Sequence, residues 1–513
     1  MKKLLHFLGI CVLTSLFVFS PFTYASMDAM EAQEEEAIEG EEATASAEDS
    51  LVLSIQHTVN ADKPLPPKTV MLPWSDIDDN PLVIVQSLID EVMEQLPFGS
   101  TTPIKVRTEV SVKLEDDVAK VLGDIPKLTI NTQQDAKQNI ISDIAYPAYH
   151  REVPKEFEAG TIDWKGVTGQ IAYTQASQSI NIVMNTDGLA IEKKEDFKFN
   201  FGKLALNLGL DANTLPTKVD FTFAGFNSAD LTNNNSGVNL SEVVLKMDTK
   251  QSSLGVKLSD GYFTLKQVDY AEGQEKMSLE GLKLTAASNE EGEVIHFSFG
   301  STLQKLRLPT LPGLGKPFSL DNYTGNWAFR NIDEKSLLSV QQSMQQFTGQ
   351  GIVNLSEDAA GMAMFALMGT LMQITPDVIA RSPEIALTQL NMSTSEGNLN
   401  ANGVVKIDGS QVKELSEPAI VAAIQAQAKL LMAKQLLKAF FMMDNASEDR
   451  AEKSISEAQK EGWLVPEGNT ALKSELSMAN GKLTVNGKVM FDLKEQGNPE
   501  EAEPTEEKAT DSK

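Results

Sequence analysis

The chain is almost without cysteine: of its 513 residues, only Cys11 carries a thiol, and it lies in the N-terminal apolar run. If that run is removed, the mature chain has no thiol, which excludes disulfides, thiolate metal sites and cysteine nucleophiles together. Histidine is nearly as scarce, with four residues, His6, His57, His150 and His296. No His-Glu-x-x-His, Gly-x-Ser-x-Gly or phosphate-binding glycine loop occurs in the sequence. The sequence therefore predicts no metal and no cofactor, and it makes an enzyme the less favoured class.

Positive charge is in short supply. The chain has 44 Lys+Arg against 72 Asp+Glu, and removing the first 25 residues takes two lysines but no acid, so the balance becomes 42 − 72 = −30. Such a chain repels nucleic acid and anionic lipid headgroups at long range. Residues 26–50 and 497–513 hold much of the acidic excess and lack aromatic residues, so we predict a disordered linker and a disordered tail. Nucleic acid is excluded as a partner.

Only the start of the chain has a long hydrophobic run. Two lysines precede the run from Leu4 to Phe19, and small residues follow at Thr23 and Ala25. This order is typical of a bacterial export signal and predicts a signal peptide over residues 1–25, cut after Ala25, with release into the periplasm of a Gram-negative bacterium. The run is also close to the roughly 17 residues that can stay as an anchor. The alternative is therefore an inner-membrane protein facing the periplasm, and membrane association is expected only in that case.

The rest of the chain divides by pattern into three regions. These are a mixed α/β N-terminal region over 51–159, an antiparallel β-meander over 160–308 and a helix-hairpin C-terminal region over 309–496. In the middle region apolar residues alternate with polar ones, as at Phe197, Phe199 and Phe201, between short clusters of Gly, Asn, Asp and Ser. This period of two predicts an antiparallel sheet with one apolar and one polar face. Such a sheet must close, fold over itself, lie under helices or hold an apolar ligand.

The C-terminal region repeats helices followed by hairpins. Helices are predicted over about Glu334–Phe347, Ser356–Ile374, Ser416–Met443 and Glu448–Gly462, and a hairpin joins Ile385–Met392 to Leu399–Ile407. Lysines interrupt the third helix, which favours a buried or bridging helix over a membrane span. Asn480-Gly481 and Asn486-Gly487 lie between alternating strands, which predicts tight turns rather than a binding loop. The fold class is therefore α+β, a long antiparallel β-meander with helices packed mainly in the C-terminal half.

The stretch DIDDNP is similar to the start of a calcium loop. It fails as one, because Pro81 stands where the loop needs glycine and Ser87 where it needs a bidentate glutamate. Asn80 and Pro81 instead predict the start of an amphipathic helix that runs to about Leu96.

One helix is rich in methionine. The stretch AAGMAMFALMGTLMQI, residues 359–374, is apolar nearly all round and too short to span a bilayer. It is either a buried core helix or a pliable surface for an apolar ligand or partner. The candidate residues for that surface are Met362, Met364, Phe365, Met368 and Met372.

The C-terminal stretch GWLVPEGNTALKSELSMANGKLTVNGK, which follows an alanine-rich helix, resembles the YdgA-like family of bacterial envelope proteins, whose shared domain is domain of unknown function 945. SPEIALTQLNMSTSEGNLNANGVVKIDG resembles that family's recurrent strand, Glu-Gly turn and strand, and GTIDWKGVTGQIAY is a further similarity. The resemblance covers roughly Gly160 to Met490. It implies an envelope protein that projects into the periplasm, and it brings no catalytic residue.

Three functional hypotheses follow. The first is a non-enzymatic envelope protein that binds or shields lipid or another apolar molecule on its sheet, and it predicts an open apolar groove. The second is an assembly factor that contacts other envelope proteins without a small ligand, and it predicts a closed core with an exposed apolar patch. The third is a hydrolase, which would need a cleft that gathers His150 with carboxylates.

Overall fold

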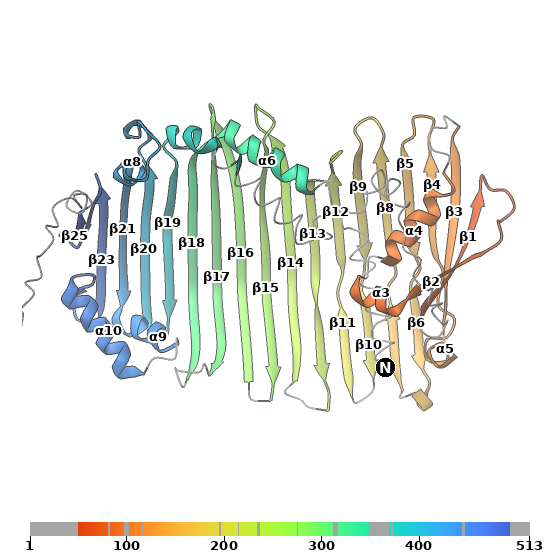
Figure 1. The fold of residues 1–513 in the computed structure, drawn as a ribbon. Helices are drawn as coiled ribbons and strands as arrows, with labels where there is room; N and C mark the ends of the chain where they lie inside the picture. Colours follow the sequence, from red (N-terminus) through yellow and green to blue (C-terminus); the bar gives the residue numbers. More distant parts are fainter. Residues whose placement is uncertain are drawn as a thin grey trace, which may run out of the picture. The chain divides into compact units, whose positions relative to one another are not determined.

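The computed structural model describes residues 50–492, apart from 81–82, 97–101, 115, 158, 194–195, 214, 233–235, 274, 311–315, 349–368, 371–372 and 444–446. The chain forms two compact units, and Figure 1 shows their strands and helices as a ribbon. Unit 1 comprises Met1–Ala286 with Gln341–Met368, and unit 2 comprises Ala287–Val340 with Gly369–Lys513. Each unit is built mainly from antiparallel strands, and most helices belong to the second half of the chain. The predicted α+β fold class is confirmed.

Unit 1 contains most of the short strands. Its strands are β1 (Ser50–Val59), β2 (Lys68–Pro73), β3 (Ile104–Lys113), β4 (Leu128–Gln134), β5 (Ile140–Tyr146), β6 (Tyr149–Val153), β7 (Gly160–Trp164), β8 (Val167–Thr174), β9 (Ser179–Thr186), β10 (Leu189–Lys193), β11 (Phe197–Phe201), β12 (Leu204–Leu210), β13 (Pro216–Asp230), β14 (Ser236–Gln251), β15 (Lys257–Glu272) and β16 (Glu275–Glu291). The neighbours run β2, β1, β3, β4, β5, β8, β9, β12, β13, β14, β15 and β16. A second row, β6, β7, β10 and β11, joins the far half of β13.

The strands of this unit are interrupted along one line, which we call the kink line. It separates β5 from β6, β7 from β8, β9 from β10 and β11 from β12, so that each pair is one long strand broken in the middle. The same line continues through Gly225, Glu242 and Gly281 of the next strands, all with positive φ. On both sides of it the strands keep their antiparallel pairing, for example Phe223 with Val243 and Phe226 with Leu240.

The kink line coincides with a change in apolar spacing. Along each strand apolar residues recur at every second position, but at the kink line the next apolar residue comes three positions later. The pairs are Trp164 and Val167, Phe201 and Leu204, Phe223 and Phe226, Leu240 and Val243, Leu265 and Val268, and Leu279 and Leu282. Phe201 lies 4.6 Å from Phe223 between ring centroids, and Phe199 lies 6.3 Å from Phe226. Because Phe199 and Phe201 share one face of a strand, both partners lie on that face, and the backbone irregularity keeps the apolar side continuous.

Helices cover the apolar side of unit 1 at its N-terminal end. They are α3 (Trp74–Asp79), α4 (Val83–Met93) and α5 (Asp116–Leu122). Ile77 of α3 and Ile84 of α4 join one buried cluster with Ile55, Trp164 and Met184. The helix predicted after Asn80 is confirmed as α4, and Asp76 and Asp78 belong to α3 rather than to a calcium loop.

Unit 2 continues with long strands. These are β17 (Val294–Thr310), β18 (Pro317–Asp333), β19 (Glu384–Thr394), β20 (Gly397–Ile407), β21 (Ile424–Ala433), β22 (Val465–Glu467), β23 (Ala471–Ala479), β24 (Lys482–Val485) and β25 (Lys488–Asp492). They pair in the order β17, β18, β19, β20, β21, β23, β24 and β25, with β22 also on β23. The helices that follow strands here are α6 (Glu334–Thr348), α8 (Glu417–Ala423), α9 (Lys434–Met443) and α10 (Glu448–Glu461). The predicted β19–β20 hairpin is confirmed, with Ile385 opposite Val405.

The long third helix predicted from Ser416 to Met443 is wrong. Its middle is strand β21, which has α8 before it and α9 after it. Alanine, glutamine, lysine and leucine favour helices, but β21 hydrogen-bonds to β20 on one side and to β23 on the other. Two complete ladders and a buried face outweigh the helical preference of this stretch.

Both Asn-Gly pairs are turns, as predicted. Asn480 and Gly481 have φ of 52° and 76°, and Asn486 and Gly487 have φ of 50° and 77°, as tight hairpin turns require. The side chain of Asn486 does more than allow a turn. Its amide nitrogen donates to the carbonyl oxygen of Gly462 at 2.9 Å, and its oxygen accepts from the backbone nitrogen of Glu475 at 2.8 Å. Asn486 thus joins the end of α10 to β23.

Candidate functional site: an apolar sheet face

The methionine-rich surface predicted from the sequence lies outside the described residues. This holds for all five candidates, Met362, Met364, Phe365, Met368 and Met372. Within the described ranges, the candidate sites are the apolar faces of the sheets and the clusters of polar side chains.

The apolar face of unit 2 is formed by side chains that stand in register on neighbouring strands. Phe299 of β17 is opposite Trp327 of β18, and Phe329 is opposite Ile385 of β19, which is opposite Val405 of β20. The rings of Phe299 and Phe329 meet edge to face, with centroids 5.8 Å apart. Phe299 and Trp327 are each 44% exposed, Ile385 is 49% exposed and Val405 is 48% exposed. We call these five residues the open apolar patch.

Helix α9 covers a different part of the same face. Leu436 of α9 is fully buried against Leu399 of β20 and Met432 of β21, and Phe440 packs on the same cluster. Leu399 and Val405 lie on one side of β20 because their positions differ by six, an even number, and side chains alternate between the two faces of a strand. The face is therefore closed under α9 and uncovered at the open apolar patch.

Unit 1 has an apolar face of the same kind. Met184 and Leu204, near its covered end, are each 2% exposed. Further along the sheet, Leu245 of β14 is 37% exposed and Leu284 of β16 is 42% exposed. Leu245 and Leu284 both stand opposite Phe263 of β15, so they belong to one row. In this unit too, the apolar side changes from buried to accessible along the strand order.

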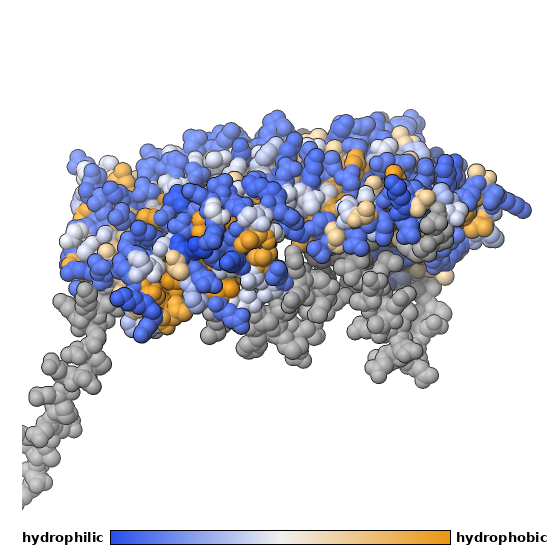
Figure 2. Space-filling model, turned by 90° about the horizontal axis from the view of Figure 1, so that it is seen from above, coloured by the Kyte–Doolittle hydropathy of each residue, from blue (hydrophilic) through white to orange (hydrophobic). Residues whose placement is uncertain are grey.

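The open apolar patch offers almost nothing but hydrocarbon surface. Its strands β18, β19 and β20 each have a hydrogen-bonded neighbour on both sides, so none of the three presents a free sheet edge. Seen from above, hydrophobic residues gather in patches on a largely hydrophilic surface (Figure 2). Exposed apolar groups that stand together on a soluble surface mark binding sites more often than isolated ones.

A buried polar cluster in unit 1 places a hydroxyl, an imidazole and a carboxylate in a row, as a catalytic triad does. Nδ1 of His57 lies 2.9 Å from the hydroxyl of Thr108, and its Nε2 lies 4.0 Å from Oε2 of Glu91. The side chain of Lys68 forms an ion pair with Glu91 at 2.6 Å. Thr108 has no exposed surface, so its hydroxyl is closed to any substrate. The cluster is structural, and Nε2 of His57 and Oε2 of Glu91 have no hydrogen-bond partner within the described residues.

This cluster predicts a pH dependence of stability. Burial lowers the pKa of His57 below its usual value of 6.5, although Glu91 and Glu94 oppose the shift. The unfolded chain therefore binds a proton below pH 6.5 that the folded chain does not, and the free energy of unfolding falls as pH drops from 6.5 toward the lower folded pKa. We expect a slope of up to about 1.4 kcal/mol per pH unit in that window, which the variant His57→Gln lacks. Urea unfolding at several pH values checks this, and equal slopes in both proteins would contradict it.

The other two histidines that follow the N-terminal run do not form a catalytic cleft. His150, the residue that the hydrolase hypothesis would place in a cleft, lies on β6 with its side chain 62% exposed and its Nδ1 4.0 Å from Oδ1 of Asp163. Lys165 already pairs with that carboxylate at 2.5 Å. His296 stands on β17 opposite a bulge of β18, where its Nδ1 accepts from the backbone nitrogen of Asn331 at 3.2 Å.

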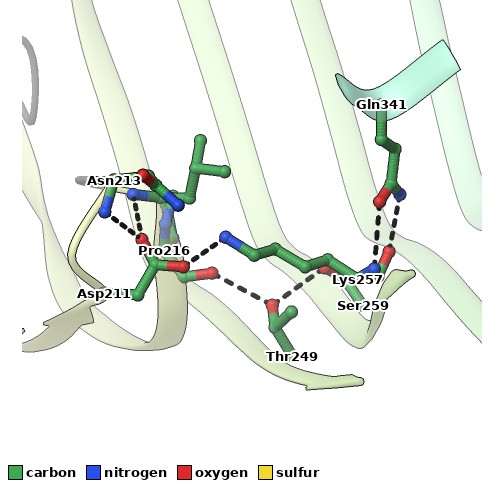
Figure 3. A network of polar contacts seen from close by, with 8 residues as sticks. Asp211, Asn213, Pro216, Thr249, Lys257, Ser259 and Gln341 are labelled. Carbon is green, nitrogen blue, oxygen red and sulfur yellow. Dashed lines mark hydrogen bonds and ion pairs between the residues drawn. The ribbon is translucent and has the colours of Figure 1, made fainter. Parts of the chain in front are cut away.

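A further polar network in unit 1 is also internal (Figure 3). The Asp211 carboxylate accepts from the backbone nitrogens of Asn213 and Leu215 and from Nζ of Lys257. Burial would raise the pKa of Asp211, but these hydrogen bonds outweigh it and lower the pKa. The side chain of Gln341 holds the backbone of Lys257 through two hydrogen bonds of 3.0 Å and 2.9 Å. The groups are already paired, so the network fixes the start of β15.

A metal site would need several ligating side chains close together, and a membrane span would need a long apolar helix. Across residues 50–492 as far as they are described, no group of three or more His, Cys, Asp or Glu side chains is arranged to hold a metal ion. None of the helices in these ranges has the length and apolar character that crossing a bilayer requires.

The family model described as "Bacterial protein of unknown function (DUF945)" matches residues 95–491. The chain therefore belongs to this family, and the family assignment made from the C-terminal motifs is confirmed. No curated protein and no solved structure is significantly similar to the chain. The family description assigns no activity.

Proposed function

We propose that the protein is an exported, non-enzymatic envelope protein that binds the hydrocarbon chain of a lipid on its apolar sheet face. The observation that carries the proposal is the open apolar patch, where four side chains, Phe299, Trp327, Ile385 and Val405, are 44–49% exposed. An exposed patch is also what an assembly factor that contacts other envelope proteins would present, and the lipid-binding tests below separate the two functions. The N-terminal export signal supports a location in the periplasm, where lipids must cross water between membranes.

The chemistry of the patch favours a hydrocarbon chain over a polar ligand. The patch side chains of Phe299, Phe329, Ile385 and Val405 are hydrocarbon, and a hydrocarbon chain has no hydrogen-bonding group that needs a partner. A polar ligand would lose its hydrogen bonds to water here and gain none in return.

The free energy gained by burying the side chains of the patch is large enough for reversible binding. If four side chains each bury roughly 80 Å² more, the gain is roughly 8 kcal/mol at about 25 cal/mol per Å², and the ligand buries a similar area of its own. The total gain is then about 16 kcal/mol, and an association cost of about 8–12 kcal/mol, the middle of the usual range, leaves about 4–8 kcal/mol. This corresponds to a dissociation constant in the micromolar to millimolar range. The net charge of −28 repels anionic headgroups, so a zwitterionic or neutral lipid should bind more tightly than an anionic one.

Trp327 is a built-in reporter for this proposal. We expect a brominated lysophosphatidylcholine, used below its micelle concentration, to quench the fluorescence of Trp327, because the bromine atoms would lie against the indole. The variant Trp327→Phe should lose that part of the quenching. Ile385→Glu should weaken binding by about tenfold or more, since a carboxylate on the apolar face costs over 1.4 kcal/mol.

The matched control is Leu431→Glu. Leu431 is 38% exposed, and it alternates with Leu430 and Met432, which face α9, so its side chain points away from the apolar face. We expect this variant to bind the lipid as the unchanged protein does. Binding at the patch would be contradicted if Trp327→Phe showed as much quenching as the unchanged protein. It would also be contradicted if Ile385→Glu and Leu431→Glu lost lipid affinity to the same extent.

A further inference from the structure

The polar side of unit 2 carries a hollow, separate from the open apolar patch. It has a volume of about 370 Å³ and lies over β19, β20, β21 and β23. Ligand pockets commonly start at about 300 Å³, so this volume suits a small organic molecule rather than a single ion.

Side chains in register line this hollow. Asn391 of β19 is opposite Asn400 of β20, and Asn400 is opposite Leu431 of β21. The next row pairs Asn402 of β20 with Lys429 of β21, and Lys429 with Glu475 of β23. Since neighbouring strands lie about 4.8 Å apart, the lining presents polar groups at regular intervals across the sheet.

Three of the four amide side chains that line this hollow are not used by the protein itself. The fourth, Gln389, accepts a hydrogen bond through its side-chain oxygen from the side-chain nitrogen of Asn326 at 3.1 Å. The side chains of Asn391, Asn400 and Asn402, by contrast, have no hydrogen bond to any part of the chain that the structure describes. Each amide offers two donors and an acceptor on one side chain. Three unpaired amides that face one hollow therefore offer a group of donors and acceptors to a ligand.

The charge of the lining is balanced, unlike that of the whole chain. Lys429 and Lys473 stand against Glu467 and Glu475, so the formal charge of the lining is zero, whereas the chain carries −28. Lys473 and Glu467 pair with each other at 3.3 Å. A charged ligand would meet an equal number of like charges, so the hollow favours a neutral molecule.

We propose that this hollow binds a short uncharged saccharide. A sugar hydroxyl both donates and accepts, which matches amide side chains that do the same. The exposed side chain of Leu431 offers an apolar surface for the C–H groups of a sugar ring. An extended peptide is disfavoured, because peptides add to a sheet at an edge strand and β20 and β21 are interior strands.

Two neutral trisaccharides, maltotriose and chitotriose, test the proposal on the full mature chain. We expect saturation-transfer NMR to show saturable binding of at least one of them at concentrations up to about 10 mM, and the double variant Asn400→Ala, Asn402→Ala to raise the dissociation constant by about tenfold or more. The side chains of Asn400 and Asn402 are exposed, so the double variant should keep the circular dichroism and melting temperature of the unchanged protein.

The control variant is Asn398→Ala. Asn398 is exposed on β20, on the same side as Asn400, but it does not line the hollow. It should leave saccharide binding unchanged. The proposal is overturned if neither trisaccharide binds the unchanged protein, if the double variant binds as well as Asn398→Ala does, or if glycerophosphoethanolamine binds the hollow and the trisaccharides do not. Lipid binding at Trp327 is independent of all three results.

Discussion

Gly225→Ala should lower the free energy of unfolding of unit 1 by about 3 kcal/mol or more. Gly225 lies on the kink line with φ of 110°, a conformation that residues with a side chain rarely adopt. A methyl group there would overlap the carbonyl oxygen of Leu240 on the neighbouring strand. Its own carbonyl oxygen accepts from the backbone nitrogen of Gly202 at 2.8 Å, so the strand cannot shift without breaking that bond. Scanning calorimetry should show a lower melting temperature, by roughly 2–4 °C for each kcal/mol.

Gly255→Ala is the matched control. Gly255 has φ of 94°, but nothing lies within 4 Å of the position that a methyl group would take. It should therefore show only the conformational cost of about 1–2 kcal/mol. If the two variants melt at the same temperature, the close approach of Gly225 to Leu240 does not contribute to the stability of the kink line.

Asp333→Ala should destabilise unit 2 by about 3 kcal/mol. Asp333 is 3% exposed and ends β18 immediately before α6. Its Oδ2 accepts from the backbone nitrogen and the hydroxyl of Ser336, at 2.9 Å and 2.8 Å, which caps the first turn of α6. Its Oδ1 accepts from Nε of Arg381 at 3.0 Å. Burial would raise the pKa of Asp333, but these hydrogen bonds outweigh it and hold the pKa below its usual value of 3.8.

The conservative variant Asp333→Asn separates the two roles. An asparagine can still cap α6, but it has no charge for Arg381, so we expect a loss smaller than that of the alanine variant. Urea unfolding of both variants and the unchanged protein measures the difference. An alanine variant as stable as the unchanged protein would show that Asp333 does not hold β18 to α6.

The strands were largely predictable because their signal is local. Alternation at Phe197, Phe199 and Phe201 gave β11, and the Ser395 to Gly397 turn gave the β19–β20 hairpin. The kink line was also present in the sequence, as the spacing of three between Phe223 and Phe226. That spacing becomes informative only when it recurs in neighbouring strands, and the pairing of strands is not a local property.

The exposed parts of the sheet could not be predicted in the same way. Alternation marks Phe297 and Phe299 as apolar positions of one face, but their burial depends on what covers that face. Helix α9 covers Leu399 and not Val405 because β21, predicted as helix, places it there. The hydrogen bonds by which the Asn486 side chain joins α10 to β23 could not be predicted either. Its partners Gly462 and Glu475 come together only in the folded unit.

Native mass spectrometry tests the lipid proposal most directly. The protein would be purified without detergent and weighed intact, and an organic extract of the same sample would be analysed for lipids. We expect a lipid bound in stoichiometric amount to the unchanged protein, and its loss from a variant that combines Trp327→Glu with Ile385→Glu. A clean mass for the protein alone, together with a failure to take up added phosphatidylcholine, would contradict lipid binding on the apolar sheet face.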